Sequence, residues 1–376
     1  ARRGQPEKAD HPQPQGLIGS ADKPMPDDWY STDAWTEYGL KFIDEAIAAD
    51  KPFFLHLAHN APHFPLQARA EDIALFRGKY LDGWDKLSEA RHGRQIAMGL
   101  IDSNWKKAER PDDVKAWDSL SDAEKDRFDH IMATYAACVY AMDRSIGELV
   151  EGLKQRGQFE NTLILFMSDN GGNAEGGPNG NSDGDPTTAA SNWFCGKSWA
   201  WMQNTPFERF KHFNHEGGIA TPLIAHWPKG IAARGEYRSQ QTHVIDIMAT
   251  VVDVCGGEYP KEVDGITIWP TEGKSLVPAF ADEPIERDAL YWEHEGNAAV
   301  RQGDWKLVRF GGNGAWELYD MKSDRTEQNN LAEEKPEIAA KLKQKWLDWA
   351  KIRGVSPNGK PKLSAPKKFA IEQVVN

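Results

Sequence analysis

Three clusters of polar side chains in this chain are of the types that carry out chemistry. His59 and His63 lie four residues apart in a proline-containing loop, Asp169 and Asn170 follow an apolar run, and the segment 211–218 carries one lysine, two histidines and one glutamate. Imidazoles and carboxylates transfer protons, and oxygen-bearing side chains bind hard cations. Each cluster alone also fits a structural role, because a histidine in a loop or a lysine on the surface needs no function.

The run 161–172 is the clearest of these sites, because an apolar stretch changes abruptly into polar residues and glycines. Leu163 to Met167 is a short apolar run, and its length and the glycines after it favour a strand buried on both faces, as in a parallel sheet. Asp169 and Asn170 then lie at the carboxyl end of that strand, where open parallel sheets bind ligands. A carboxylate and an amide oxygen there could bind a hard cation, or could form an Asx-turn without chemistry.

Helices and strands alternate around these clusters. A helix is predicted to begin near Ser31, with residues 31–33 as candidate caps, and a buried strand over 53–58 runs directly into His59. A long helix is predicted over 129–157 because apolar residues recur every three or four positions, and it leads into the strand 163–167. A short strand over 222–227 and a helix over 242–255 follow, while 64–127 is read as an excursion outside the sheet. Helix–strand repetition predicts an α/β fold with a mostly parallel sheet flanked by helices.

The C-terminal part has a different pattern. Short apolar runs over 289–292, 298–301, 305–308 and 316–319 are about ten residues apart and are separated by Gly and Asp turns, which predicts an antiparallel meander. A helix over 336–353 follows. We therefore expect an α/β domain over 1–284, a smaller antiparallel sheet with a helix over 285–356, and a tail over 357–376.

Composition narrows the function classes. The 376 residues are 40% hydrophobic and 27% charged, and the net charge is −12 without a basic stripe, which argues against nucleic acid as the partner. No apolar run approaches the length of a membrane span. The three cysteines, Cys138, Cys195 and Cys255, match no zinc spacing, and their odd number leaves the redox compartment open. The oligomeric state is not readable from the sequence.

Taken in order, the clusters resemble the sulfatase family of the alkaline-phosphatase superfamily. The resemblance runs from about Trp29 to about Ala350. It rests on the following motifs: His59-Asn60-Ala61-Pro62-His63 with Phe64-Pro65-Leu66-Gln67, Ser168-Asp169-Asn170-Gly171-Gly172, Lys211 before Glu216-Gly217-Gly218-Ile219, Thr221-Pro222-Leu223-Ile224, Trp227-Pro228, Gly273-Lys274-Ser275-Leu276, Gly303-Asp304-Trp305-Lys306 and Glu317-Leu318-Tyr319-Asp320.

The resemblance implies a role for each matching residue. Asp169 and Asn170 would bind one divalent cation, usually calcium, with magnesium as the alternative. Asn170 also argues against membership of the two-zinc phosphatases, because an amide oxygen suits calcium better than zinc. Lys211 would contact the sulfate, and His63 would contact the sulfate or the ester oxygen and could act as general acid. Positive groups aimed at oxygens that carry or gain negative charge are the electrostatic arrangement that sulfate-ester cleavage needs.

The remaining site residues have less defined roles. The resemblance places His59 behind the groups that contact substrate or in the wall of the cleft. His215 and Glu216 would either line the substrate side or hold the glycine turn that follows them. The Trp- and Gly-rich segment 172–205 is too long for a passive connection, and its aromatic residues would suit a sugar or aryl ring.

The chain departs from the family in the features that belong to the family's N-terminal part. Sulfatases carry a formylglycine made in a Cys/Ser-x-Pro-x-Arg motif, and no cysteine or serine here fits that motif; an early Asp-Asp pair of metal ligands has no convincing counterpart either. We expect a chain that represents the C-terminal three-quarters of a sulfatase, inactive alone, with the formylglycine in a missing N-terminal part.

Other interpretations stay open. The chain could be a non-catalytic binding protein of sulfatase fold, or a phosphodiesterase or phosphonate hydrolase of the same superfamily. For a sulfatase, the expected substrate is a small-molecule or carbohydrate sulfate ester, and the expected location is the bacterial periplasm or the outside of the cell.

Overall fold

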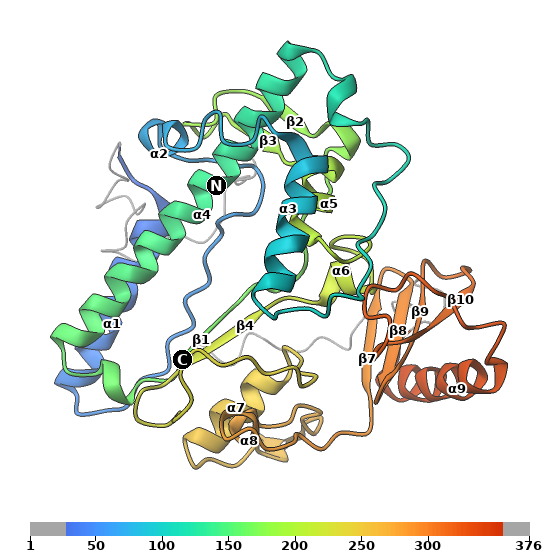
Figure 1. Cartoon of the computed structure of the whole chain (residues 1–376). Helices are drawn as coiled ribbons and strands as arrows, with labels where there is room; N and C mark the ends of the chain where they lie inside the picture. Colours follow the sequence, from blue (N-terminus) through green and yellow to red (C-terminus); the bar gives the residue numbers. More distant parts are fainter. Residues whose placement is uncertain (1–27, 356–376) are drawn as a thin grey trace.

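The computed structural model describes residues 28–355. It shows a mixed α/β arrangement followed by a C-terminal antiparallel sheet of four strands (Figure 1). The helices are α1 Ser31–Ala48, α2 Ala70–Ala74, α3 Gly83–Ala97, α4 Asp122–Gln155, α5 Gly196–Asn204, α6 Glu216–Ile219, α7 Asp246–Val254, α8 Val277–Phe280 and α9 Pro336–Arg353, with 3₁₀ turns at Trp117–Ser119, Phe159–Asn161 and Gly177–Asn179. The strands are β1 Ile164–Met167, β2 Asn181–Asp183, β3 Asn192–Phe194, β4 Leu223–His226, β5 Glu262–Val263, β6 Ile266–Thr267, β7 Leu290–His294, β8 Asn297–Gln302, β9 Trp305–Arg309 and β10 Trp316–Asp320.

The long helix α4 forms one side of the molecule, with α1 packed along it (Figure 1). It begins seven residues before the predicted start because Ser121 and Glu124 form a capping box, in which each side chain accepts a hydrogen bond from the other residue's backbone N–H. Its buried face continues into a core of tryptophan rings, in which Trp84 lies edge-on to Trp117 and Trp199. The segment 64–127, expected to lie outside the sheet, contributes Trp84 and Trp117 to this core.

The pairing of β1 differs from the prediction. β1 pairs with β4 in an antiparallel ladder, with Phe166 opposite Ile224, and among residues 28–355 no parallel ladder is present. The predicted strand 53–58 is not assigned as a strand. Leu55 and Leu57 approach Gly39 of α1, as one face of a strand would, but the segment has no neighbouring strand to pair with in the described chain.

The C-terminal sheet confirms the predicted meander. Its strands follow the order β10-β9-β8-β7, each antiparallel to the next, and α9 covers one face (Figure 1). Val300, Leu307 and Leu318 are fully buried beneath Trp346 of α9. α9 begins at Pro336 and ends before Gly354, which has a positive φ, so its ends match the predicted helix 336–353. The predicted tail, 357–376, lies outside the described residues.

Candidate active site

Two residues far apart in the sequence, His63 and Lys211, meet at the centre of the candidate site. Lys211 Nζ lies 3.0 Å from His63 Nε2. His63 Nδ1 lies 2.6 Å from the carbonyl oxygen of Phe64, which can only accept, so Nδ1 carries the proton. Nε2 therefore presents a lone pair, to which the Lys211 ammonium group donates. An anion placed against this pair would draw the same ammonium hydrogens to its own oxygens.

Aromatic rings form a wall beside this pair. The Phe64 ring stacks on His63 at a centroid distance of 4.4 Å and on Phe194 of β3 at 4.5 Å. Lys211 Nζ lies 6.0 Å from the centroid of Phe64, within cation–π range. The segment 172–205, whose aromatic residues are expected to suit a sugar or aryl ring, thus supplies Phe194 to the stack beside His63.

The two glycines after Asn170 hold Lys211 in position. The backbone N–H of Lys211 donates to the carbonyl of Gly172 at 3.0 Å, and Gly171 N–H donates to the carbonyl of Gly218 at 3.0 Å. A Cβ at position 171 would lie 1.8 Å from the carbonyl oxygen of Gly217, so only glycine fits this approach. The strand end and the lysine loop are therefore joined through their backbones.

Asn204, which no sequence motif predicts, completes this arrangement. Its side-chain oxygen accepts from Gly172 N–H at 2.9 Å, and its side-chain nitrogen donates to the carbonyl of Arg209 at 3.0 Å. The side-chain amide of Asn204 thus links the C-terminal end of α5 to both loops of the site. No periodic pattern marks such a residue; its only signal in the sequence is a polar residue at the end of an apolar helix.

Asp169 and Asn170 lie just beyond the end of β1. Asp169 is exposed and Asn170 is half-buried, and neither side chain takes part in a hydrogen bond between residues of the described chain. Their oxygens are the kind of donor that calcium and magnesium bind. The chemical type of these ligand atoms therefore suits a hard cation. Two residues, however, supply fewer oxygens than the 6–8 of a complete calcium site.

His59 lies in the loop that leads to His63. It is half-buried, and both of its ring nitrogens are shielded from solvent without a hydrogen-bond partner in the part of the chain that the structure describes. Burial lowers the pKa of His59 below its ordinary value of 6.5, because a positive charge is poorly solvated there. The lowered pKa favours the neutral imidazole, and the role of His59 in the site stays a prediction.

His215 and Glu216 do not lie on an open substrate face. His215 is 1% exposed and bonds Glu317 through Nε2 at 2.8 Å. Glu216, at the start of α6, forms buried ion pairs with Lys306 at 2.8 Å and Arg325 at 3.1 Å. Burial alone would raise the pKa of Glu216, but Lys306 and Arg325 lower it below its ordinary value. Of the two expected roles, the structure supports the second, in which His215 and Glu216 hold the glycine turn. Their partners Glu317 and Lys306 belong to the C-terminal sheet.

Comparison with known proteins identifies the family. A family model described as Sulfatase matches residues 6–257, and a second, described as N-sulphoglucosamine sulphohydrolase, C-terminal, matches residues 207–351. The chain belongs to the sulfatase family. An uncharacterized sulfatase of Schizosaccharomyces pombe is 32% identical over 375 residues, which cover 92% of this chain and 65% of that protein. The arylsulfatase of Klebsiella aerogenes is 32% identical over 264 residues, which cover 67% of this chain and 56% of the relative.

Solved sulfatase structures share the fold. The crystal structure of Ps i-CgsB in complex with k-i-k-neocarrahexaose superposes with a TM-score of 0.59 at 26% identity, covering 88% of this chain and 57% of that one. The fold class is therefore the alkaline-phosphatase-like fold of sulfatases, with the C-terminal antiparallel sheet described above. The chain spans less than two thirds of the length of each of these three relatives. Among the described helices, none is long and apolar enough to cross a membrane.

Proposed function

We propose that this chain supplies the anion-binding part of a sulfuric-ester hydrolase. The observation that carries the proposal is the pair formed by Lys211 Nζ and His63 Nε2, 3.0 Å apart, beside the glycine turn that follows Asp169 and Asn170. In a chain of the sulfatase family, a cation and an imidazole that face the same space fit the tetrahedral, negatively charged head of a sulfate ester.

Each residue of the proposed site then has its own role in binding or cleaving the ester. Lys211 turns its ammonium hydrogens from His63 to the sulfate oxygens and balances their charge. Phe64 fixes the His63 ring through its carbonyl oxygen and its stacked side chain, so Nε2 faces the substrate. Nε2 can hold a proton for the leaving oxygen once Lys211 has turned away. Asp169 and Asn170 would hold a divalent cation, calcium or magnesium, which would draw electron density from the sulfate oxygens when bound.

The proposal includes a further strand from outside residues 28–355. The backbone of 53–59 makes no hydrogen bond to another backbone group of the described chain, so its N–H and C=O groups remain available for pairing with a further strand. Phe54 is 67% exposed, and the cross-strand partners Phe166 and Ile224 are 38% and 58% exposed. No Cys/Ser-x-Pro-x-Arg motif occurs in the 376 residues. We place the nucleophile on a segment that packs against these unpaired surfaces.

A carbohydrate sulfate ester is the substrate class we favour. One structural relative was solved in complex with k-i-k-neocarrahexaose, and the family model over 207–351 is described as N-sulphoglucosamine sulphohydrolase, C-terminal. The aromatic rings of Phe64 and Phe194 beside His63 would suit the apolar face of a sugar ring. The proposed location is the bacterial periplasm or the outside of the cell, which fractionation of the source organism tests.

Turnover of an aryl sulfate tests the catalytic part of the proposal. The 376-residue chain alone should show no turnover of p-nitrophenyl sulfate above background, and only weak calcium binding, measured calorimetrically and reduced further by Asp169→Ala. A chain extended with the upstream coding sequence should hydrolyse the ester, and Lys211→Ala should lower its kcat/KM. Turnover by the 376-residue chain alone would contradict the expected absence of the nucleophile.

The other two interpretations give different results in the same assay. A phosphodiesterase or phosphonate hydrolase would prefer phosphorus esters, so kcat/KM for matched sulfate and phosphate esters decides between these activities. A binding protein of sulfatase fold would bind sulfated sugars through Lys211 and His63, yet the extended chain would turn over neither ester.

A further inference from the structure

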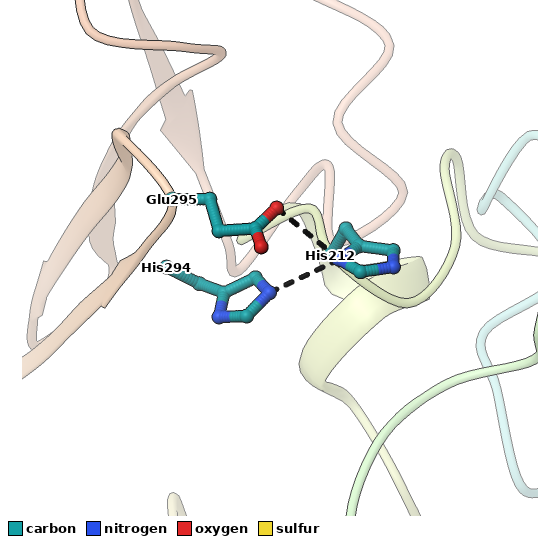
Figure 2. Close-up of side chains that lie close together, drawn as sticks. All are labelled: His212, His294 and Glu295. Atoms are coloured by element: carbon teal, nitrogen blue, oxygen red, sulfur yellow. Dashed lines mark hydrogen bonds and ion pairs between the residues drawn. The ribbon is translucent and has the colours of Figure 1, made fainter. Parts of the chain in front are cut away.

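A second cluster of side chains lies outside the proposed sulfate site. His212 follows Lys211, while His294 ends β7 and Glu295 begins the turn that leads to β8 (Figure 2). His212 Nδ1 lies 3.0 Å from His294 Nε2 and 3.7 Å from a Glu295 carboxylate oxygen. One ligand atom from each residue falls within 4.8 Å of the others. We call these three residues the histidine–glutamate cluster.

A carboxylate behind the cluster orients His212. Glu175 Oε1 lies 3.1 Å from His212 Nε2, so Nε2 carries the proton and donates to it. Nδ1 is then left with its lone pair directed at His294 and Glu295. This carboxylate–histidine pairing is the arrangement that holds metal-binding histidines in place and strengthens their basicity. The other oxygen of Glu175 is shielded from solvent and has no partner among the described residues.

The backbone around the cluster is fixed by a buried asparagine. The Asn297 side chain, 6% exposed, donates to the carbonyl oxygens of both His212 and His294, at 2.8 and 3.0 Å. One amide group therefore holds the two histidine-bearing loops together. His212 and Glu295 also adopt positive φ values of 81° and 51°, which non-glycine residues hold only where their surroundings impose them.

The geometry points to a binding site for a Zn²⁺-like divalent transition metal, with His212 Nδ1, His294 Nε2 and the Glu295 carboxylate as ligands. Zinc binds imidazole nitrogens at about 2.0–2.1 Å in tetrahedral sites, which separates two ligand nitrogens by about 3.3 Å. The two nitrogens here are 3.0 Å apart, so small side-chain movements make room for the ion. Two histidines and one carboxylate leave a fourth position for water.

The chemistry of the ligands separates this site from the proposed sulfate site. Imidazole ligands select zinc, copper, nickel or cobalt, whereas calcium and magnesium select oxygen ligands such as those of Asp169 and Asn170. His212 and Glu295 are 42% and 71% exposed in their side chains, so an ion can enter from solvent. A bound ion would tie the loop of Lys211 to the C-terminal sheet and fix the position of that lysine.

Metal titration of the 376-residue chain, prepared without an affinity tag and stripped with a chelator, tests the site. Calorimetry with Zn²⁺ should show one site per chain, and Co²⁺ should give the visible absorption of a tetrahedral nitrogen–oxygen site. His294→Ala and Glu295→Gln should each weaken Zn²⁺ binding at least about tenfold, and Glu175→Gln about 10–100-fold, the effect typical of residues that orient a ligand. Because Glu295 is exposed, its isosteric variant also serves if His294→Ala fails to fold.

Two control variants keep this test separate from the proposed function. His56→Ala removes an exposed histidine outside the cluster, and Asp169→Ala removes the proposed calcium ligand; both should leave Zn²⁺ affinity unchanged. Excess calcium should not displace the ion. The site is rejected if the wild-type chain binds Zn²⁺ no better than Glu295→Gln and His294→Ala, or if Asp169→Ala abolishes the binding. None of these results depends on ester hydrolysis.

Discussion

The strand pairs β8–β9 and β1–β4 are both antiparallel and built from short apolar runs, but they differ in how completely they are buried. In the C-terminal sheet, Val300, Leu307 and Val308 are fully buried. In the other pair, Phe166 and Ile224 face each other across the ladder and remain 38% and 58% exposed. Because burial of apolar surface is the main source of stability, the C-terminal sheet stabilises this chain, while the strands that carry the candidate site contribute much less.

The polar groups show the same contrast. On the C-terminal side, the fully buried Lys306 pairs with both Glu216 and Glu327, each at 2.8 Å. On the other side, Asp169 is exposed at the end of β1, and the Lys211–His63 pair is open to solvent. Charges that are paired and buried hold the structure together, whereas charges that face open space are available to a ligand. The difference separates the residues that maintain the fold from those that would bind substrate.

The largest expected effect is the loss of Lys306. Lys306→Met leaves Glu216 and Glu327 buried without their shared cation, and breaking a buried pair in this way costs about 3–5 kcal/mol. Lys345→Met is the matched control, because its partner Asp288 is largely exposed and such a pair contributes about 0–1 kcal/mol. Urea unfolding followed by circular dichroism measures both. Equal losses for the two variants would mean that the buried network contributes no more than a surface pair.

An intermediate effect is expected from a direct comparison of the two strand pairs. Leu318→Ala removes a fully buried side chain of the C-terminal sheet and should cost about 2–5 kcal/mol. Ile224→Ala acts on a side chain that is 58% exposed and should change the free energy of unfolding by less than about 1 kcal/mol. The same unfolding assay compares them. A large loss for Ile224→Ala would show that this face is covered in solution by another part of the chain or by a second copy.

The sequence predicted best what local signals determine. The sequence of α9 contains its own boundary signals, Pro336 at the start and Gly354 after the end, and the helix begins and ends there in the structure. The start of α4 was missed because the capping box of Ser121 and Glu124 lies before the apolar repeat that revealed the helix. The segment 53–58 was predicted as a strand from composition alone, but a strand also needs a neighbour, which composition does not specify.

The site was predictable only through its family resemblance. His63 and Lys211 are 148 residues apart, and no spacing rule connects them; the sulfatase motifs did. Glu216 was assigned two roles because its partner Lys306 lies 90 positions away. The side-chain amides of Asn204 and Asn297, which join separate loops, have no repeating pattern to reveal them. Contacts between distant loops depend on the folded backbone, and a single sequence does not report them.

The smallest expected effect concerns pH and the half-buried His59. Burial lowers its pKa from 6.5, so the unfolded chain binds its proton more tightly than the folded chain does. Its contribution to stability is therefore present above pH 6.5 and is lost as the pH falls toward the lower, folded pKa.

Between about pH 7.5 and pH 5.5, the wild-type chain should lose more free energy of unfolding than His59→Phe, while His56→Phe, a change at an exposed histidine, should behave as wild type. Burial also lowers the pKa values of His130 and His243, but both remain in every variant, so the difference between the variants isolates His59. Identical pH dependence in the wild type and in His59→Phe would mean that the His59 ring is open to water in the folded chain.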